Sequence, residues 1–291
     1  MRLEQGQTDH QYNSNDPDVN QAQNPKLQRE AERTRQRTED IKKIITDLDT
    51  EYSNQHSGSH DPAYSEFRLP GAVALLSDPE REHALPFPIV YSGTPTRFEV
   101  SEDYWRYVGR EIFPTLLRSL RLVQKNPSYK RLWVYGTRGY GKSHLLAALV
   151  CYMSALGEHV IYVPDCRSWL DDPAGVFKAA LMFAFPDKTT QDKILTLDTR
   201  MKLQNFVHAQ ENVLFVIGQM NAISSKTEDT ETLRLRKLNL SDWLIELIPP
   251  HKAVLSSSAN NRDYLMTQNK ENYNYTMNAY GGLTQVYLNT G

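Results

Sequence analysis

Residues 131–153 constrain the fold more than any other stretch, because they join an apolar run, a glycine-rich turn and a second apolar run. From Gly136 to Ser143 the turn fits the pattern G-x-x-x-x-G-K-[ST]. In this pattern the glycines let backbone N–H groups turn inward around a phosphate, and the helix that follows directs its positive end toward the same anion. A strand before the turn and a helix after it are the context that the motif requires. The stretch therefore predicts a phosphate-binding loop between a buried strand and a helix.

The residues of this turn have expected roles. Lys142 should reach the β- and γ-phosphates of a nucleotide, which makes it the first catalytic candidate, and the Ser143 hydroxyl should be a ligand of Mg²⁺. The expected cofactors are therefore ATP and Mg²⁺. The residues expected to bind the nucleotide are Gly136, Thr137, Arg138, Gly139, Tyr140, Gly141, Lys142, Ser143 and His144.

Charge and composition argue against several classes of protein. The 291 residues carry 33 Lys and Arg against 35 Asp and Glu, and a net charge of −2 gives no general attraction to nucleic acid or to a membrane. Residues 1–18 lack the apolar region of a signal peptide, and no apolar run is long enough to span a bilayer. Cys151 and Cys166 lie in or beside apolar segments and are expected as buried thiols. We expect a soluble intracellular protein that binds nucleotide, without support for nucleic acid or membrane as a partner.

Residues 1–65 are polar and poor in aliphatic side chains, and such a segment is expected to remain a disordered arm. Residues 25–52 alternate acidic and basic side chains and place four apolar ones on one helical face, namely Ile41, Ile44, Ile45 and Leu48. We interpret this part as a solvated, partly formed helix on the arm; a helix that binds a protein partner is the alternative. Residues 66–291 are then expected to form the nucleotide-binding domain.

The segment before the turn mixes short elements. Five prolines between residues 70 and 95 forbid a long helix there and indicate short extended pieces. Residues 101–124 are predicted to be a helix with Ser101 as its N-cap. In ATPases of this general kind the segment before the phosphate loop closes over the adenine, and the aromatic candidates for such a pocket are Tyr104, Trp105 and Tyr107.

The apolar run within residues 212–223 is predicted to be the strand that carries the second nucleotide motif. A P-loop ATPase normally ends this strand in an Asp that holds Mg²⁺, and a Glu follows to polarise the attacking water. Gly218 and Gln219 occupy these two places. Glutamine can orient water but cannot accept its proton, so Gln219 is a second catalytic candidate for a protein with weak or absent hydrolysis. Asp165, after the apolar run at residues 160–163, is the alternative source of a carboxylate.

Further strands complete a predicted α/β fold, a three-layer parallel sheet with helices on both faces. Helices are expected within residues 173–210, with a break at Pro186 and a second helix at residues 192–208, and a short one at residues 241–248. The fourth strand lies near residues 252–257. The polar residues after it could sense the γ-phosphate or simply form a turn; they are Ser258, Asn260 and Asn261, of which Asn260 is the third catalytic candidate. Arg262 lies near the usual place of an arginine finger. A fifth, edge strand is expected near residues 275–280, without a helical lid after it.

Several segments together resemble a known family. The series PFP, GRE, PDCR, QMN, SSAN and YGG around the phosphate loop is similar to the P-loop ATPase region of Crinkler effector-type proteins of oomycetes and fungi, across residues 85–285. The resemblance implies an ATP-binding module of the AAA+ and STAND kind, which in that family often precedes a nuclease-like or kinase-like domain and is associated with secretion and the host nucleus.

Three departures from that family limit what the resemblance implies. Gly218 stands where the family usually has Asp, residues 1–60 contain no counterpart of the translocation header, and the C-terminal enzymatic domain has no counterpart. We therefore expect a truncated or degenerate member that binds nucleotide as a conformational switch. An active Mg²⁺-dependent ATPase and an effector that acts only by binding a partner are the alternatives.

Overall fold

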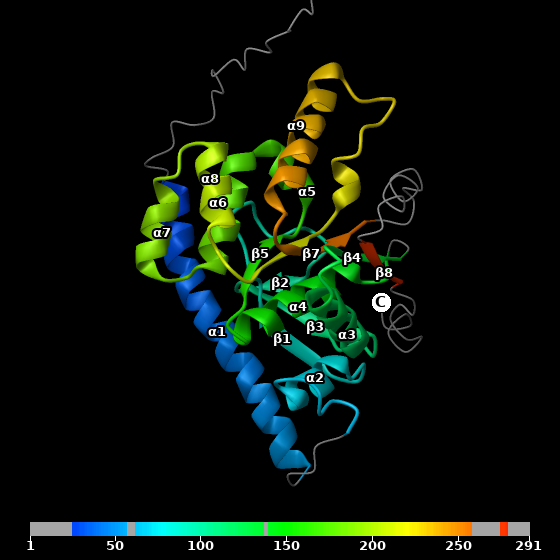
Figure 1. The fold of residues 1–291 in the computed structure, drawn as a ribbon. Coiled ribbons are helices and arrows are strands. Elements are labelled where there is room, and N and C mark those ends of the chain that lie inside the picture. The colour runs from blue at the N-terminus through cyan, green and yellow to red at the C-terminus, as the bar shows by residue number, and fades with distance from the viewer. Residues whose placement is uncertain (1–24, 57–61, 137–138, 258–273, 279–291) are drawn as a thin grey trace, which may run out of the picture.

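The computed structural model describes residues 25–56, 62–136, 139–257 and 274–278 (Figure 1). Its main sheet has five described strands in the order β5-β6-β7-β4-β8, and every described pairing between them is parallel. The strands are β4 (Arg131–Tyr135), β5 (His159–Val163), β6 (Val213–Ile217), β7 (Lys252–Ser256) and β8 (Asn274–Asn278). Strand β7 is inserted between β4, which leads into the glycine turn, and β6, which ends just before Gly218. Strand β5 is an edge strand of the described sheet.

The strands are short and apolar because helices cover both faces of the sheet. All five positions of β6 are buried. Figure 1 shows α3 (Phe113–Lys125) and α4 (Lys142–Ala155) on one side of the sheet, and α5 (Cys166–Asp171) and α9 (Glu231–Leu247) on the other. Parallel strands need such crossover helices, which return the chain to the same end of the sheet. The predicted three-layer α/β fold is confirmed.

Residues 25–55 form a helix that belongs to the hydrophobic core. Helix α1 (Pro25–Gln55) packs against α2 (Pro70–Ser77), α4 and α6 (Pro173–Ala184). Its Leu27, Ile41 and Ile45 have no exposed surface and join the same apolar cluster as the sheet. The predicted helix is present, but its interpretation as a solvated helix on a flexible arm is wrong for these residues. The apolar face that suggested a partner is covered by the rest of the chain.

A small antiparallel sheet precedes β4, in the order β1-β3-β2. It consists of β1 (Glu82–Pro86), β2 (Val100–Ser101) and β3 (Tyr104–Val108). The helix predicted over residues 101–124 is therefore wrong in its first half. Glu102 and Asp103 adopt left-handed backbone angles, with φ of 52° and 67°, and turn the chain back on itself after Ser101. Helix α3 begins only at Phe113, where Pro114 fits its first turn.

The remaining helices refine the predicted boundaries. The helix predicted at residues 192–208 is two helices, α7 (Lys188–Leu195) and α8 (Arg200–His208). Thr199 separates them, because its Oγ1 accepts a hydrogen bond from the Lys202 N–H at 3.1 Å and caps α8. Helix α9 is longer than predicted and starts behind Thr230, which caps it in the same way. A single turn of 3-10 helix, η1 (Met220–Ala222), follows β6.

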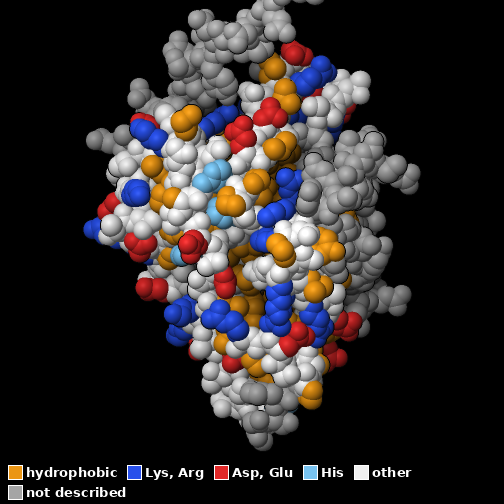
Figure 2. Space-filling model, in the orientation of Figure 1, with side chains coloured by type: hydrophobic (Ala, Val, Ile, Leu, Met, Phe, Trp, Pro, Cys, Tyr) orange, Lys and Arg blue, Asp and Glu red, His pale blue; other side chains and the backbone are white. Residues whose placement is uncertain are grey.

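The surface carries charges of both signs. Figure 2 shows Lys and Arg side chains interspersed with Asp and Glu across the face viewed. Within the described ranges, no helix combines the length and hydrophobicity needed to cross a membrane.

Candidate phosphate-binding site

A cavity of about 1060 Å³ opens where β4, β6 and β7 end. Gly139 and Gly141 of the glycine turn form one wall, Gln219 and Asn221 after β6 form a second, and Ser256 and Ser257 at the end of β7 form a third. Residues 224–228, which lead toward α9, close one side. Ligands of open α/β sheets bind in the crevice outside the carboxyl ends of the strands, and this cavity lies at that edge.

The glycine turn has the backbone that an anion cradle needs. Gly139 and Gly141 adopt φ values of 92° and 68°, a left-handed conformation that side-chain-bearing residues rarely take. Gly141 is the N-cap of α4 and provides no side chain to cap the helix, so the first N–H groups of this 14-residue helix have no side-chain cap. A Cβ at Gly141 would lie 2.2 Å from Nη2 of Arg110, because that guanidinium packs directly on the turn. The helix N-terminus and the turn together favour a bound anion.

Lys142 lies inside this cradle. Its Nζ donates a hydrogen bond to the Gly136 carbonyl oxygen at 2.5 Å, and burial lowers the pKa of its ammonium group. A phosphate in the cavity would favour the charged form of Lys142. Ser143 also lines the cavity. Tyr140 is 37% exposed and is not part of the cavity wall, and Thr137 and Arg138 lie outside the described residues.

His144 lines the same cavity but carries no charge at neutral pH. Its ring centroid lies 4.6 Å from that of Phe98 and 5.5 Å from that of Trp105. Burial, together with Arg110 and Arg97 nearby, lowers the pKa of His144 to about 4. The side chain is therefore a neutral, packed support behind the turn.

The strand that should carry the acidic motif ends just before Gly218, as predicted. The Gly218 N–H donates to the Val163 carbonyl oxygen at 2.8 Å, and its own carbonyl oxygen accepts from the Cys166 N–H at 3.3 Å. A Cβ at this position would lie 2.4 Å from the Pro164 carbonyl oxygen. Gln219, which adopts a left-handed φ of 59°, does line the cavity. Of the two places that normally hold carboxylates, one is closed by backbone and the other presents an amide.

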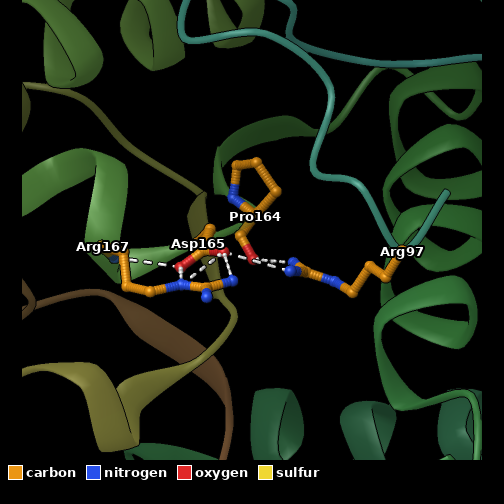
Figure 3. Close-up of polar contacts among 4 residues, drawn as sticks. All are labelled: Arg97, Pro164, Asp165 and Arg167. Carbon is orange, nitrogen blue, oxygen red and sulfur yellow. Dashed lines mark hydrogen bonds and ion pairs between the residues drawn. The ribbon is translucent and has the colours of Figure 1, made fainter.

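The carboxylate of Asp165 is held between two arginines (Figure 3). Arg167 approaches it to 2.6 Å through Nη2, and Arg97 to 3.1 Å through Nη1. Arg97 also donates to the Pro164 carbonyl oxygen at 2.7 Å. Burial alone would raise the pKa of Asp165, but the hydrogen bonds from the two arginines outweigh it and hold the pKa below its usual value. Asp165 also caps α5 through the Arg167 N–H, so its oxygens are fully engaged.

Arg97 and Arg167 are site residues that the sequence analysis did not identify. Both line the cavity. Arg167 follows Asp165 in the PDCR segment, and its nearness to a strand end could have indicated it. Arg97 comes from a loop 68 positions earlier in the chain, and no local pattern connects it with the phosphate loop.

The aromatic candidates for an adenine pocket are core residues instead. Trp105 and Tyr107 have no exposed surface, and the Tyr107 hydroxyl donates to the Leu76 carbonyl oxygen at 3.1 Å. The interpretation of these two as walls of a base pocket is wrong, because the inward positions of β3 pack behind the phosphate loop. Tyr104 lies at the start of β3 and is not among the residues that line the cavity.

The described residues fit a phosphate better than a metal held by protein carboxylates. Ser143 offers one hydroxyl, Asp165 is occupied by guanidinium groups, and the Glu228 side chain is 73% exposed beside Lys226. Across the described ranges, no group of three or more His, Cys, Asp and Glu could hold a metal ion. The candidates Ser258, Asn260, Asn261 and Arg262 lie outside those ranges.

The order of the strands and the glycine turn identify the fold. The chain has the fold of a P-loop NTPase domain, with one strand inserted between the strand that leads into the glycine turn and the strand that ends before Gly218. No family model matches the sequence, and no curated protein matches it.

Two solved structures show a distant likeness. One is described as the crystal structure of a DNA replication initiation factor, with 16% identity over 56% of this chain and 44% of that one and a TM-score of 0.31. The other is AMPPCP-bound DnaA from Aquifex aeolicus, with 18% identity over 60% of this chain and 49% of that one and a TM-score of 0.33. The chain thus spans about half the length of the solved chains that it matches.

Proposed function

We propose that this P-loop domain binds ATP as a conformational switch and hydrolyses it weakly or not at all. The observation that carries the proposal is a phosphate cradle that faces, among the described residues, two positions without the usual carboxylates. Lys142, the N-terminus of α4 and the left-handed glycines converge on a cavity at the strand ends. Across that cavity Gly218 and Gln219 stand in place of the carboxylates.

The size of the cavity favours a nucleotide over inorganic phosphate. Pockets for small molecules and cofactors usually enclose roughly 300–1,000 Å³. The cavity of about 1060 Å³ here is slightly larger than that range, and it is far larger than one phosphate group fills. A base and a ribose could follow the phosphates along the cavity wall.

The chemistry around the expected water position supports slow hydrolysis. A general base must accept a proton from the attacking water, and the amide of Gln219 cannot do so. Asp165 does not replace it, since two guanidinium groups hold the carboxylate and favour its charged, hydrogen-bonded form. If Mg²⁺ accompanies the nucleotide, the Ser143 hydroxyl is the group of the glycine turn that would meet it.

The sequence segments that resemble Crinkler effector-type proteins line the same cavity. Three segments on which the resemblance rests, PDCR, QMN and SSAN, contribute Arg167, Gln219, Asn221 and Ser257 to the wall. Segments far apart in the sequence thus meet at one site, which supports a shared nucleotide-dependent role. In that role the switch would signal to an effector domain or to a host partner.

Titration calorimetry with ATP and ADP, with phosphate release followed in parallel, tests the proposal. Lys142→Ala should abolish nucleotide binding, whereas Lys43→Ala, which removes an exposed lysine of α1, should not change it. Undiminished binding to Lys142→Ala would refute the phosphate role. Steady Mg²⁺-dependent phosphate release that Lys142→Ala removes would favour the active ATPase, and no nucleotide binding by the wild type would favour partner binding alone.

A further inference from the structure

The cavity has an excess of positive charge that a metal-dependent nucleotide site does not need. Its described wall contains four basic side chains, Arg97, Lys142, Arg167 and Lys226, against one carboxylate, Glu228, and the Asp165 carboxylate lies behind the two arginines. The Glu228 side chain is 73% exposed and lies 3.8 Å from Lys226. His144 adds no charge at neutral pH. A free divalent cation would be repelled by this wall, whereas a polyphosphate would be attracted.

Among the described residues, the usual carboxylate ligands for a metal beside the phosphates are absent. Mg²⁺ sites in such enzymes combine one or two carboxylates with phosphate oxygens and water. The backbone closes position 218 to any side chain, because a Cβ there would meet the Pro164 carbonyl oxygen at 2.4 Å. Gln219 offers a neutral amide in the next position. The described donor set therefore does not fit a resident Mg²⁺.

Arg97 has unused hydrogen-bonding capacity at this site. Its side chain is 22% exposed, and its two Nη atoms contact Asp165 and the Pro164 carbonyl oxygen. Its Nε is buried and has no hydrogen-bond partner among the described residues. A buried donor without a partner costs free energy, and an acceptor oxygen of a ligand would remove that cost.

A second orphan donor lies behind the glycine turn. The guanidinium group of Arg110 packs on Gly141, and its Nε is likewise buried without a hydrogen-bond partner in the described part of the chain. Burial of the guanidinium group lowers the pKa of Arg110. Its field adds to that of the α4 N-terminus at the place where a phosphate would lie.

The geometry points to a nucleotide site that binds the uncomplexed triphosphate, with Arg97 and Arg167 supplying the positive charge that Mg²⁺ supplies elsewhere. This inference rests on the proposed function. Guanidinium groups suit the task because they bind phosphate oxygens through two parallel hydrogen bonds and stay charged at any physiological pH. Asp165 would hold both arginines in place until the phosphates compete for them.

Calorimetric titration of the full chain with ATP, once in EDTA and once in excess Mg²⁺, tests this inference. The affinity for ATP in EDTA should equal or exceed the affinity in Mg²⁺. Arg97→Gln and Arg167→Gln should each weaken the affinity in EDTA by about tenfold, which is the effect of losing one charge-assisted hydrogen bond. Arg97→Lys keeps the charge and should retain most of the affinity, which separates loss of charge from misfolding. Arg29→Gln, at an exposed position of α1, is the matched control.

The outcomes separate the two proposals. ATP binding that strengthens tenfold or more when Mg²⁺ is added would overturn the metal-free site and leave the proposed function standing. Absence of binding under both conditions would overturn both. If Arg97→Gln and Arg167→Gln instead bind ATP in EDTA as tightly as the control Arg29→Gln does, that result would show that Arg97 and Arg167 do not neutralise the phosphates.

Discussion

The Pro164 carbonyl oxygen lies 2.4 Å from where a Cβ of Gly218 would be. Replacing Gly218 by the aspartate that is usual in the second nucleotide motif would therefore not be enough to restore that motif, because the backbone leaves no space for a side chain. Gly218→Asp should fail to restore phosphate release, and it should lower the free energy of unfolding by about 1–3 kcal/mol, because the strand end must move to admit any side chain.

Denaturant unfolding and a phosphate-release assay measure both effects. Gly218→Ala adds only the Cβ and should destabilise the protein by a similar amount, which separates the steric effect from the added charge. A Gly218→Asp protein of wild-type stability with Mg²⁺-dependent turnover would contradict the assignment of this position.

Asp165→Asn distinguishes a counter-ion from a catalytic carboxylate. The substitution keeps the cap on α5 and removes a negative charge from between Arg97 and Arg167. We expect ATP to bind about 3–10 times more tightly, since a neighbouring charge pair is worth on the order of 1 kcal/mol. The matched control is Asp187→Asn, which alters the cap of α7 instead. A loss of steady phosphate release in Asp165→Asn would assign the catalytic role to this carboxylate.

The sequence predicted the layout of the sheet because its strands are continuous apolar runs between turns. The start of α4 at Lys142 and the end of β6 just before Gly218 lie where the pattern places them. It could not predict β3, since Trp105 and Val108 also fit a helical stripe. The left-handed turn at Glu102 and Asp103 is what makes residues 104–108 a strand and not a helix. The turn contains no glycine or asparagine, so the sequence does not indicate it.

The site was predictable only where its residues are contiguous. Lys142, Ser143 and His144 follow one another and share one cavity. Arg97 reaches that cavity from a distant loop, and its position depends on a tertiary contact with Pro164 that no local pattern encodes. The burial of α1 is a similar case, because the sequence shows its apolar stripe but only the packing against α4 and α6 shows that the chain itself covers that stripe.

Ile41→Ala tests whether α1 is part of the domain. Ile41 has no exposed surface and lies in the main apolar cluster, so the substitution should cost about 2–5 kcal/mol of unfolding free energy. Denaturant unfolding of the full chain gives the value. Lys43→Ala on the exposed face of the same helix should change it by less than about 0.5 kcal/mol. If the two variants are equally stable, α1 does not pack into the domain and is a solvated arm.

Gln219→Glu tests the electrostatics of the cavity with almost no change in shape. Gln219 lines the cavity, so a carboxylate there should repel the phosphates and weaken ATP binding in EDTA by about 3–10-fold, or on the order of 1 kcal/mol. Excess Mg²⁺ should reduce the loss, because the new carboxylate can share the metal with the phosphates. Calorimetry with Asn221→Asp, at a second position of the same wall, checks that the effect comes from charge. Unchanged affinity in EDTA would place the triphosphate elsewhere.

The neutral His144 should make stability depend on pH. Its folded pKa of about 4 is below the ordinary value of 6.5, so between these values the unfolded chain binds more protons than the folded one. The contribution of His144 is therefore fully present above pH 6.5 and is lost as the pH falls toward 4, by at most about 3 kcal/mol. Burial also lowers the pKa of His83 and His251, which should act in the same direction. Denaturant unfolding from pH 4 to 7 measures how the free energy of unfolding changes with pH. His144→Gln should reduce this slope and leave the contributions of His83 and His251 to it. An unchanged slope in His144→Gln would mean that the ring is already solvated and charged in the folded protein.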